Sequence, residues 1–178
     1  LHLYARRQRQ MCIRDRDANT WRFSLRRGVK FHNGNDFNAD DVLFSYKRQT
    51  QEASDMSFAL ATIKQINKVD DYTVDLITKG PDPILLLNMP MFYIVDKEWI
   101  EANNAFEVVR ASGSTNFANV NTNGTGPFKV VEWIQDTRIV LEPFEGYWGK
   151  NQIQHNLTTA VFTPISNDAT RVAALLSG

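Results

Sequence analysis

The sequence predicts a mixed α/β fold, and three patterns lead to this prediction. Apolar and polar residues alternate from Trp21 to Leu25, which is the period of a half-buried strand. After Asn38 the apolar residues recur at helical spacing instead. From Gly126 onward short alternating stretches return, separated by turn residues. Because both periods occur in one chain, we expect residues 17–178 to combine sheets with helices.

The composition is that of an ordinary globular protein. Hydrophobic residues make up 43% and charged residues 22% of the 178 residues, enough to form a packed core. The 20 basic and 20 acidic residues give a formal net charge of +0. Phosphate recognition depends on clustered Lys and Arg, so this balance argues against nucleic acid as the main partner. No apolar run approaches the roughly 20 residues that span a bilayer.

The first sixteen residues differ from the rest of the chain. Leu1 to Arg16 is rich in arginine, shows no hydrophobic periodicity and holds the single cysteine, Cys12. It has no apolar core of the kind found in a signal peptide. We interpret this segment as non-native or disordered and expect few contacts between it and the body. A basic amphipathic arm is the alternative.

The first half of the body predicts strand, turn and helix in that order. The strand around Phe23 is followed by turn chemistry at His32–Asp36. Asn38 is a typical helix N-cap, with two aspartates in the first turn after it. Val42 and Tyr46 fall on one face of that helix.

The next segments predict a hairpin and two short helices. Ile66–Val69 and Tyr72–Ile77 read as paired strands joined at two aspartates. Ile84–Leu87 predicts a buried helical turn. Asp96 is expected to cap a helix that Asn103 and its neighbour Asn104 close.

The last third predicts a separate β-rich part. Ser112–Gly126 is rich in Ser, Asn, Thr and Gly, so it is expected to be a boundary loop. We therefore divide the body into a smaller α/β subdomain, 17–115, and part of a larger lobe, 116–178. The expected elements of the second part are strands at Phe128–Trp133, Arg138–Phe144 and Leu157–Thr163, and a helix capped by Asn167 or Asp168.

Motifs for catalysis, metals and cofactors give little signal. The body has no cysteine, which excludes a cysteine-ligated zinc site, and no G-x-S-x-G nucleophile elbow occurs. The glycines at 124 and 126 lack the Walker A frame. The paired aspartates at 40–41 and 70–71 fit helix capping and turn solvation better than acid–base catalysis. We expect no catalytic residues, no metal and no cofactor.

Six segments resemble, in order, the peptide- and nickel-type solute-binding proteins of ABC importers, family 5. The first resembles the pattern F-x-L-R-x-G-V-K-F-H-x-G, and the second is the helix after it. The six are Phe23–Gly34, Phe37–Tyr46, Val69–Val74, Gly124–Phe128, Gly146–Gly149 and Arg171–Gly178. The motifs are short, but their shared order over most of the chain makes the resemblance specific.

The resemblance implies a periplasmic-binding-protein-like fold with two lobes around a cleft. Family members are longer, so we expect this chain to hold only part of the N-terminal lobe and its inserted subdomain. It implies a receptor that captures peptides or a related small solute and delivers them to permease subunits in the membrane. The expected location is periplasmic or extracytoplasmic, and the expected state of the full-length protein is a monomer.

Two other functions stay open at this point. An α/β hydrolase-type enzyme would need a nucleophile–base pair, for which the body offers no good histidine or cysteine. A sensory or chaperone-like binding module on the same fold is the second, because a fold does not fix a function.

We expect the ligand to meet loops at strand ends, since loops on a rigid scaffold carry binding. Methionine and tyrosine near Pro90 would give adaptable apolar contact, and polar groups before Gly126 would give hydrogen bonds. The candidate ligand-binding residues are Asn88, Met89, Met91, Tyr93, Asn123 and Thr125. Core packing of the methionines, with Asn123 as a turn former, is the alternative.

The expected incompleteness of the larger lobe has a consequence for stability. A severed lobe exposes apolar surface, and large exposed patches favour association. We expect the isolated chain to be only marginally stable, with Trp133, Phe144 and Trp148 as the residues most exposed to such contacts.

Overall fold

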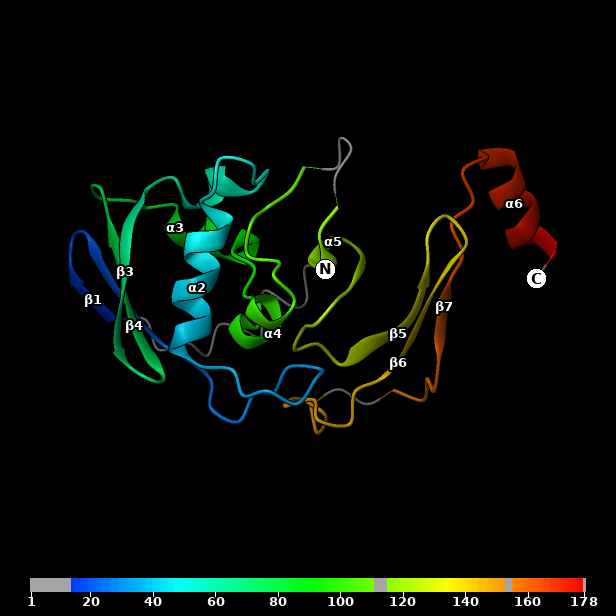
Figure 1. The fold of residues 1–178 in the computed structure, drawn as a ribbon, viewed down its shortest axis with the longest axis horizontal. Coiled ribbons are helices and arrows are strands. Elements are labelled where there is room, and N and C mark those ends of the chain that lie inside the picture. Colours follow the sequence, from blue (N-terminus) through cyan, green and yellow to red (C-terminus); the bar gives the residue numbers. More distant parts are fainter. Residues whose placement is uncertain (1–13, 111–114, 153–154, 178) are drawn as a thin grey trace. The chain divides into compact units, whose positions relative to one another are not determined.

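The computed structural model describes residues 14–110, 115–152 and 155–177. The chain divides into two compact units between Thr125 and Gly126 (Figure 1). The elements of unit 1 are β1 (Arg14–Asp17), β2 (Thr20–Ser24), α2 (Ala39–Gln49), η1 (Ser57–Leu60), β3 (Ile63–Asp70), β4 (Thr73–Thr78), α3 (Leu85–Asn88), η2 (Met89–Met91), α4 (Lys97–Ala102) and α5 (Phe117–Val120). Those of unit 2 are β5 (Phe128–Ile134), β6 (Arg138–Pro143), β7 (Ala160–Phe162) and α6 (Asp168–Ser177). The mixed α/β prediction is confirmed.

The sheet of unit 1 is antiparallel, with strand order β1-β2-β4-β3. The predicted hairpin is the β3–β4 pair, with β3 beginning three positions earlier than predicted, at Ile63. Phe23 lies opposite Val74, and both side chains are buried. Burial of this face drives the unit together, since each large apolar side chain contributes about 1.5–3 kcal/mol when removed from water.

The first strand begins inside the segment that the sequence analysis set aside. Arg14 pairs with Arg22 and Asp15 with Trp21, so Arg14–Arg16 belong to the edge of the sheet. An edge strand bonds through its backbone and needs no apolar alternation, which is why the pattern gave no sign of it. The rest of that segment, 1–13, lies outside the described residues.

Helix α2 starts where the sequence predicts and for the predicted reason. The Asn38 side chain accepts from the Asp40 N–H at 2.7 Å, and the Asp41 side chain accepts from the Asn38 N–H at 2.9 Å, forming a capping box. Val42 is buried on the face expected to be apolar. The helix contacts β3 and also α4 (Figure 1), so it lies between the sheet and the loops that follow it.

The helical turn predicted at Ile84–Leu87 forms as α3, but its predicted burial is wrong. Leu85 is fully buried, whereas Leu87 is 68% exposed and the two other apolar residues are also exposed. A single turn presents only about one residue in four to a core on one side, because successive side chains rotate by 100°. The sequence run was uniformly apolar and could not show which residue faces inward.

The segment predicted as a boundary loop is partly helical and belongs to unit 1. Residues 111–114 lie outside the described residues, and α5 follows them. The Phe117 ring packs on Trp99 with centroids 5.3 Å apart. The Asn116 amide donates to the Glu107 carbonyl at 2.6 Å. These contacts agree with a boundary of the compact units at Thr125/Gly126; the division into domains at 115/116 stays a prediction.

Unit 2 contains an antiparallel sheet of order β5-β6-β7 followed by α6. The first two strands lie where predicted, and the third is shorter, only Ala160–Phe162. Asn167 accepts from the Thr170 N–H at 2.9 Å, which confirms one of the two predicted caps of α6. Trp133 is 43% exposed, but the most exposed large apolar residues are Leu175 and Leu176 on α6. The expected marginal stability of the chain stays a prediction.

No helix within the described residues has the length and apolar character needed to cross a membrane.

The contrast within α3 gives a test of the packing. Leu85→Ala should lower the free energy of unfolding by about 2–5 kcal/mol, because it leaves a cavity under a fully buried residue. Leu87→Ala, which removes an exposed side chain of the same kind, should change it by about 0.5 kcal/mol or less. Urea denaturation of both variants measures the difference. Equal effects would contradict the placement of α3.

Candidate functional site

The segment that carries Tyr93, one of the six predicted site residues, is extended and lies along α2. Residues 92–96 belong to neither helix nor sheet. Three buried polar side chains of α2 face this segment, at the i, i+4, i+8 spacing of one helix face: Asp41, Ser45 and Gln49. We call them the polar ladder. Their bonds replace those that a neighbouring strand would supply.

The polar ladder binds alternate backbone groups of the extended segment. Gln49 donates to the Met91 carbonyl at 2.8 Å and accepts from the Tyr93 N–H at 3.0 Å. The Ser45 hydroxyl accepts from the Val95 N–H at 2.9 Å. Asp41 accepts from the Lys97 N–H at 2.9 Å, at the start of α4. The backbone direction of the whole segment is therefore fixed by one helix.

Asp96 ends the extended segment and joins it to two other parts of unit 1. Its side chain is fully buried. One oxygen accepts from the Trp99 N–H at 3.0 Å, which confirms the predicted cap of α4. The other accepts from three asparagine amides, those of Asn33 at 2.7 Å, Asn35 at 2.9 Å and Asn123 at 2.9 Å. These donors stabilise a charge that burial would otherwise make costly.

Asp41 lies close to Asp96 and to a third carboxylate, Glu98, with oxygens of the three within 4.8 Å of one another. The pKa of Asp41 is raised from 3.8 to about 6, mainly by burial, while the backbone N–H groups of Lys97 and Asn38 lower it and the nearby carboxylates of Glu98 and Asp96 add to the rise. Each oxygen of Asp41 and Asp96 already accepts from at least one donor. The cluster therefore acts as a capping network for two helices.

The structure places the predicted site residues in two groups. Asn88 and Met89 lie at the junction of α3 and η2, and Met89 packs against the core. Met91 is half-buried, whereas Tyr93 is 59% exposed on a backbone that the polar ladder fixes. Tyr93 is thus the member of the first group with most surface free to meet a ligand.

The second group is Asn123 and Thr125, at the end of unit 1. The Asn123 amide nitrogen donates to Asp96, and its oxygen accepts from the Asn33 N–H at 3.2 Å. Its side chain is thereby committed to the network, and this favours a structural role for it. Asp96 links the two groups, because it follows the segment of Tyr93 directly and binds Asn123. Ligand contact by all six residues stays a prediction.

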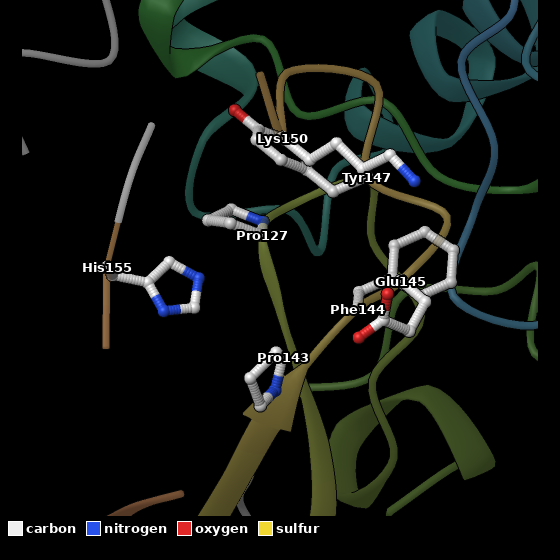
Figure 2. Close-up of a pocket in the computed structure, with 7 residues that line it drawn as sticks. All are labelled: Pro127, Pro143, Phe144, Glu145, Tyr147, Lys150 and His155. Atoms are coloured by element: carbon white, nitrogen blue, oxygen red, sulfur yellow. The ribbon is translucent and has the colours of Figure 1, made fainter. Parts of the chain in front are cut away.

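A pocket of about 460 Å³ lies in unit 2 and contains none of the predicted site residues (Figure 2). Its lining residues are Pro127, Pro143, Phe144, Glu145, Tyr147, Lys150 and His155. The Phe144 N–H donates to the Pro127 carbonyl at 2.8 Å. This bond joins the residue before β5 to the residue after β6. In Figure 2 the two prolines lie between His155 and the side chain of Glu145.

The chemistry of this pocket is mixed. Tyr147 is buried and packs on Trp148 with ring centroids 5.1 Å apart, and His155 packs on Phe128 at 4.9 Å. No ion pair within the described residues involves Glu145 or Lys150. The lining thus combines aromatic rings with one acidic and one basic side chain. In the sequence analysis this region contributed only the segment Gly146–Gly149 to the family resemblance and no candidate site residue.

Sequence comparisons relate the chain to a group of receptors. A family model described as bacterial extracellular solute-binding proteins, family 5, middle part, matches residues 14–178. The dipeptide-binding protein of Escherichia coli K12 is 33% identical over 181 residues, covering 89% of this chain and 32% of that protein. The chain spans about a third of the length of the curated relatives it matches.

Solved structures give the same relation. A periplasmic binding protein associated with an ABC transporter of Helicobacter pylori, in complex with the peptide STSA, is 31% identical with a TM-score of 0.74, covering 92% of this chain and 34% of that one. A periplasmic binding protein of Agrobacterium tumefaciens, in complex with agropinic acid, is 28% identical with a TM-score of 0.77, covering 92% and 31%. Both resemblances extend over the two units.

Removing the Asp96 carboxylate tests the network that it organises. Asp96→Ala would leave three amides and the Trp99 N–H without their acceptor, so we expect it to lower the free energy of unfolding by about 2–4 kcal/mol. The control is Asp36→Ala, in the loop that holds Asn33 and Asn35. It removes only an exposed ion pair with Lys30 and should lower the free energy of unfolding by less than about 1 kcal/mol. Urea denaturation compares the two. A smaller loss for Asp96→Ala would contradict the central position of this carboxylate.

The raised pKa of Asp41 predicts a pH dependence of stability. Between pH 3.8 and about 6 the folded chain binds a proton at Asp41 that the unfolded chain has lost, so stability falls as pH rises through this window. The contribution is roughly 3 kcal/mol for a shift of this size. We expect Asp41→Asn to remove that slope, and Asp55→Asn, at an exposed position, to keep it. The measurement is urea denaturation from pH 4 to pH 8, and an unchanged slope in Asp41→Asn would refute the assignment.

Proposed function

The chain belongs to family 5 of the bacterial extracellular solute-binding proteins, and from this membership we propose that it forms part of the solute-capturing component of an ABC importer. The observation that carries the proposal is the family match over residues 14–178. A receptor of this kind needs a shaped, mostly apolar wall with a few polar groups, and it needs no nucleophile.

The proposed solute is a peptide or a related small molecule. The E. coli relative is named a dipeptide-binding protein, and the H. pylori protein was solved with a peptide. The agropinic acid complex of the A. tumefaciens protein widens the range of solutes in similar receptors. Peptides are favoured for this chain because the peptide-binding protein of E. coli is similar to it over 89% of its length.

We place part of the solute-binding wall on the extended segment along α2. Tyr93 offers an apolar ring with a polar tip, and its backbone is held by Gln49. Met91 beside it can adapt to side chains of different shape. The proposed wall also includes Asn88, Met89, Asn123 and Thr125. A rigid backbone under adaptable side chains reduces the entropy lost on binding.

The remaining steps of transport are part of the same proposal. The opposite wall comes from a second lobe, and the two lobes close over the solute by a hinge motion. The loaded receptor, a monomer outside the cytoplasmic membrane, then delivers the solute to permease subunits. The family to which the chain belongs is an extracellular one, which supports this location.

The two alternative functions have less support. A hydrolase-type enzyme is disfavoured because the family binds solutes and the proposed wall offers no nucleophile–base pair. A sensory or chaperone-like module on the same fold would bind solute without feeding an importer. Uptake of labelled peptide by cells that lack the gene separates these: a loss of uptake supports transport, and unchanged uptake supports the sensory alternative.

Two substitutions test the proposed wall. Tyr93→Ala in the complete gene product should weaken peptide binding about 5- to 30-fold, the effect of roughly 1–2 kcal/mol. Thr125→Ala should remove one hydrogen bond between the wall and the peptide, which should weaken the binding free energy by about 0.5–1.5 kcal/mol. The matched control is Phe58→Ala, since Phe58 is 60% exposed and lies outside the proposed wall.

Isothermal titration calorimetry with a peptide library measures these affinities, and thermal denaturation checks that each variant is folded. Binding unchanged in both Tyr93→Ala and Thr125→Ala would remove this segment from the site. No binding of any peptide by the wild-type protein would contradict the proposed solute.

A further inference from the structure

The last residues of unit 1 are held against the turn at 32–35. We call residues 121–125 the exit segment, because the chain leaves unit 1 there. The His32 N–H donates to the Gly124 carbonyl at 2.8 Å. The Gly124 N–H in turn donates to His32 Nδ1 at 3.3 Å. One residue of the turn thus binds both backbone groups of one residue of the exit segment, and the two lie 92 positions apart in the sequence.

The bond to Nδ1 sets a condition on the protonation of His32. A histidine nitrogen accepts a hydrogen bond only when it carries no proton, so the ring must be neutral with its proton on Nε2. In the imidazolium form both ring nitrogens are donors. Nδ1–H would then face the N–H of Gly124, and this bond would be replaced by a repulsion. The backbone bond from His32 to the Gly124 carbonyl does not depend on the ring.

Gly124 can be fixed only through its backbone, because it has no side chain. A Cβ placed there would lie 3.6 Å from His32 Cε1, an ordinary van der Waals distance. The ring therefore packs directly against the exit segment as well as accepting its N–H. Next to it, Asn123 is held by the Asn33 N–H and by Asp96. Loss of the bond from the Gly124 N–H would leave Gly124 held only by its carbonyl, which accepts from the His32 N–H.

Within the part of unit 1 that the structure describes, three neighbouring parts contribute charged groups near this contact. Lys30 and Asp36 form an exposed ion pair at 2.7 Å in the same loop as His32. Asp96 and Glu98 belong to the start of α4, and Asp41 to the start of α2. The exit segment itself, Asn121–Thr125, has no titratable side chain. Asp96 is linked to the neighbourhood of this contact through the neutral amides of Asn33 and Asn123.

We propose that His32 is a positioning residue for the exit segment, and that protonation of its ring breaks one of the two bonds by which it holds Gly124. The part of this inference that concerns solute affinity rests on the proposed function. Thr125 of the proposed binding wall follows Gly124 directly, so loss of the Gly124 N–H bond in acid loosens this part of the wall and lowers affinity. The hydrogen bond itself and its dependence on pH hold whatever the protein binds.

Nuclear magnetic resonance of the ¹⁵N-labelled chain tests the contact directly. Long-range ¹H–¹⁵N spectra identify the protonated nitrogen of His32, and hydrogen exchange corrected for the intrinsic effect of pH reports the protection of the Gly124 amide. We expect the Nε2–H tautomer and a protected amide at pH 8. Protection should fall at least threefold, in step with protonation of the ring, as the pH is lowered to 5.

Three variants separate positioning from general stability. His32→Asn puts an amide oxygen near the place of Nδ1 and should keep the Gly124 amide protected at every pH. His32→Phe keeps a ring of similar shape without an acceptor and should leave the amide unprotected at every pH. His155→Asn, in unit 2, should behave as wild type. Another tautomer in the wild type, or pH-dependent protection in His32→Asn, would overturn the contact.

Calorimetry with the same peptides at pH 8 and pH 5, using the complete gene product, tests the functional part. Affinity should fall at least threefold at pH 5 in the wild type and stay within twofold in His32→Asn. An equal fall in both would overturn the link between the contact and binding while leaving the spectroscopic result standing. Absence of binding at either pH would contradict the proposed function instead.

Discussion

The arrangement of unit 1 depends on an extended segment that has no partner strand. Residues 92–96 would leave backbone N–H and C=O groups unpaired in the interior, at a cost of about 1–3 kcal/mol each. The polar ladder of α2, Asp41, Ser45 and Gln49, binds the backbone of this segment at Tyr93 and Val95 and the residues at its two ends, Met91 and Lys97. The same helix packs Val42 against the sheet. One helix therefore positions both the hydrophobic core and the backbone on which the proposed binding wall is built.

Asp96 connects the extended segment to other parts of unit 1 by hydrogen bonds. Its buried carboxylate has hydrogen bonds from three asparagine amides and a backbone N–H, all of them neutral donors. Neutral donors with fixed directions hold their partners in one geometry, and they stabilise the carboxylate only when all are in place. The turn at 32–35, the start of α4 and the exit segment are consequently positioned together. His32 adds to these neutral donors a bond to Gly124 that, on the proposal above, depends on pH.

The elements that the sequence predicted well are those whose cause is local. Asn38 and Asp96 each cap a helix that starts within the next residues, and both caps were predicted and formed. The hairpin and the strands of unit 2 follow from alternation over a few positions. The burial of Ile84–Leu87 was predicted wrongly, because a uniformly apolar turn does not show which of its residues meets the core.

The sequence by itself determined the mixed α/β class, the helix caps and the resemblance to a receptor family, because short stretches of side-chain pattern are sufficient for each. Only the tertiary structure decided that Asp41, Ser45 and Gln49 form a bonded face. In the sequence they are three polar residues that could equally meet solvent. It also decided that Asn123 meets Asp96 and that His32 meets Gly124. Contacts between residues so far apart in the chain depend on the packing of α2 against its neighbours, which no local pattern contains.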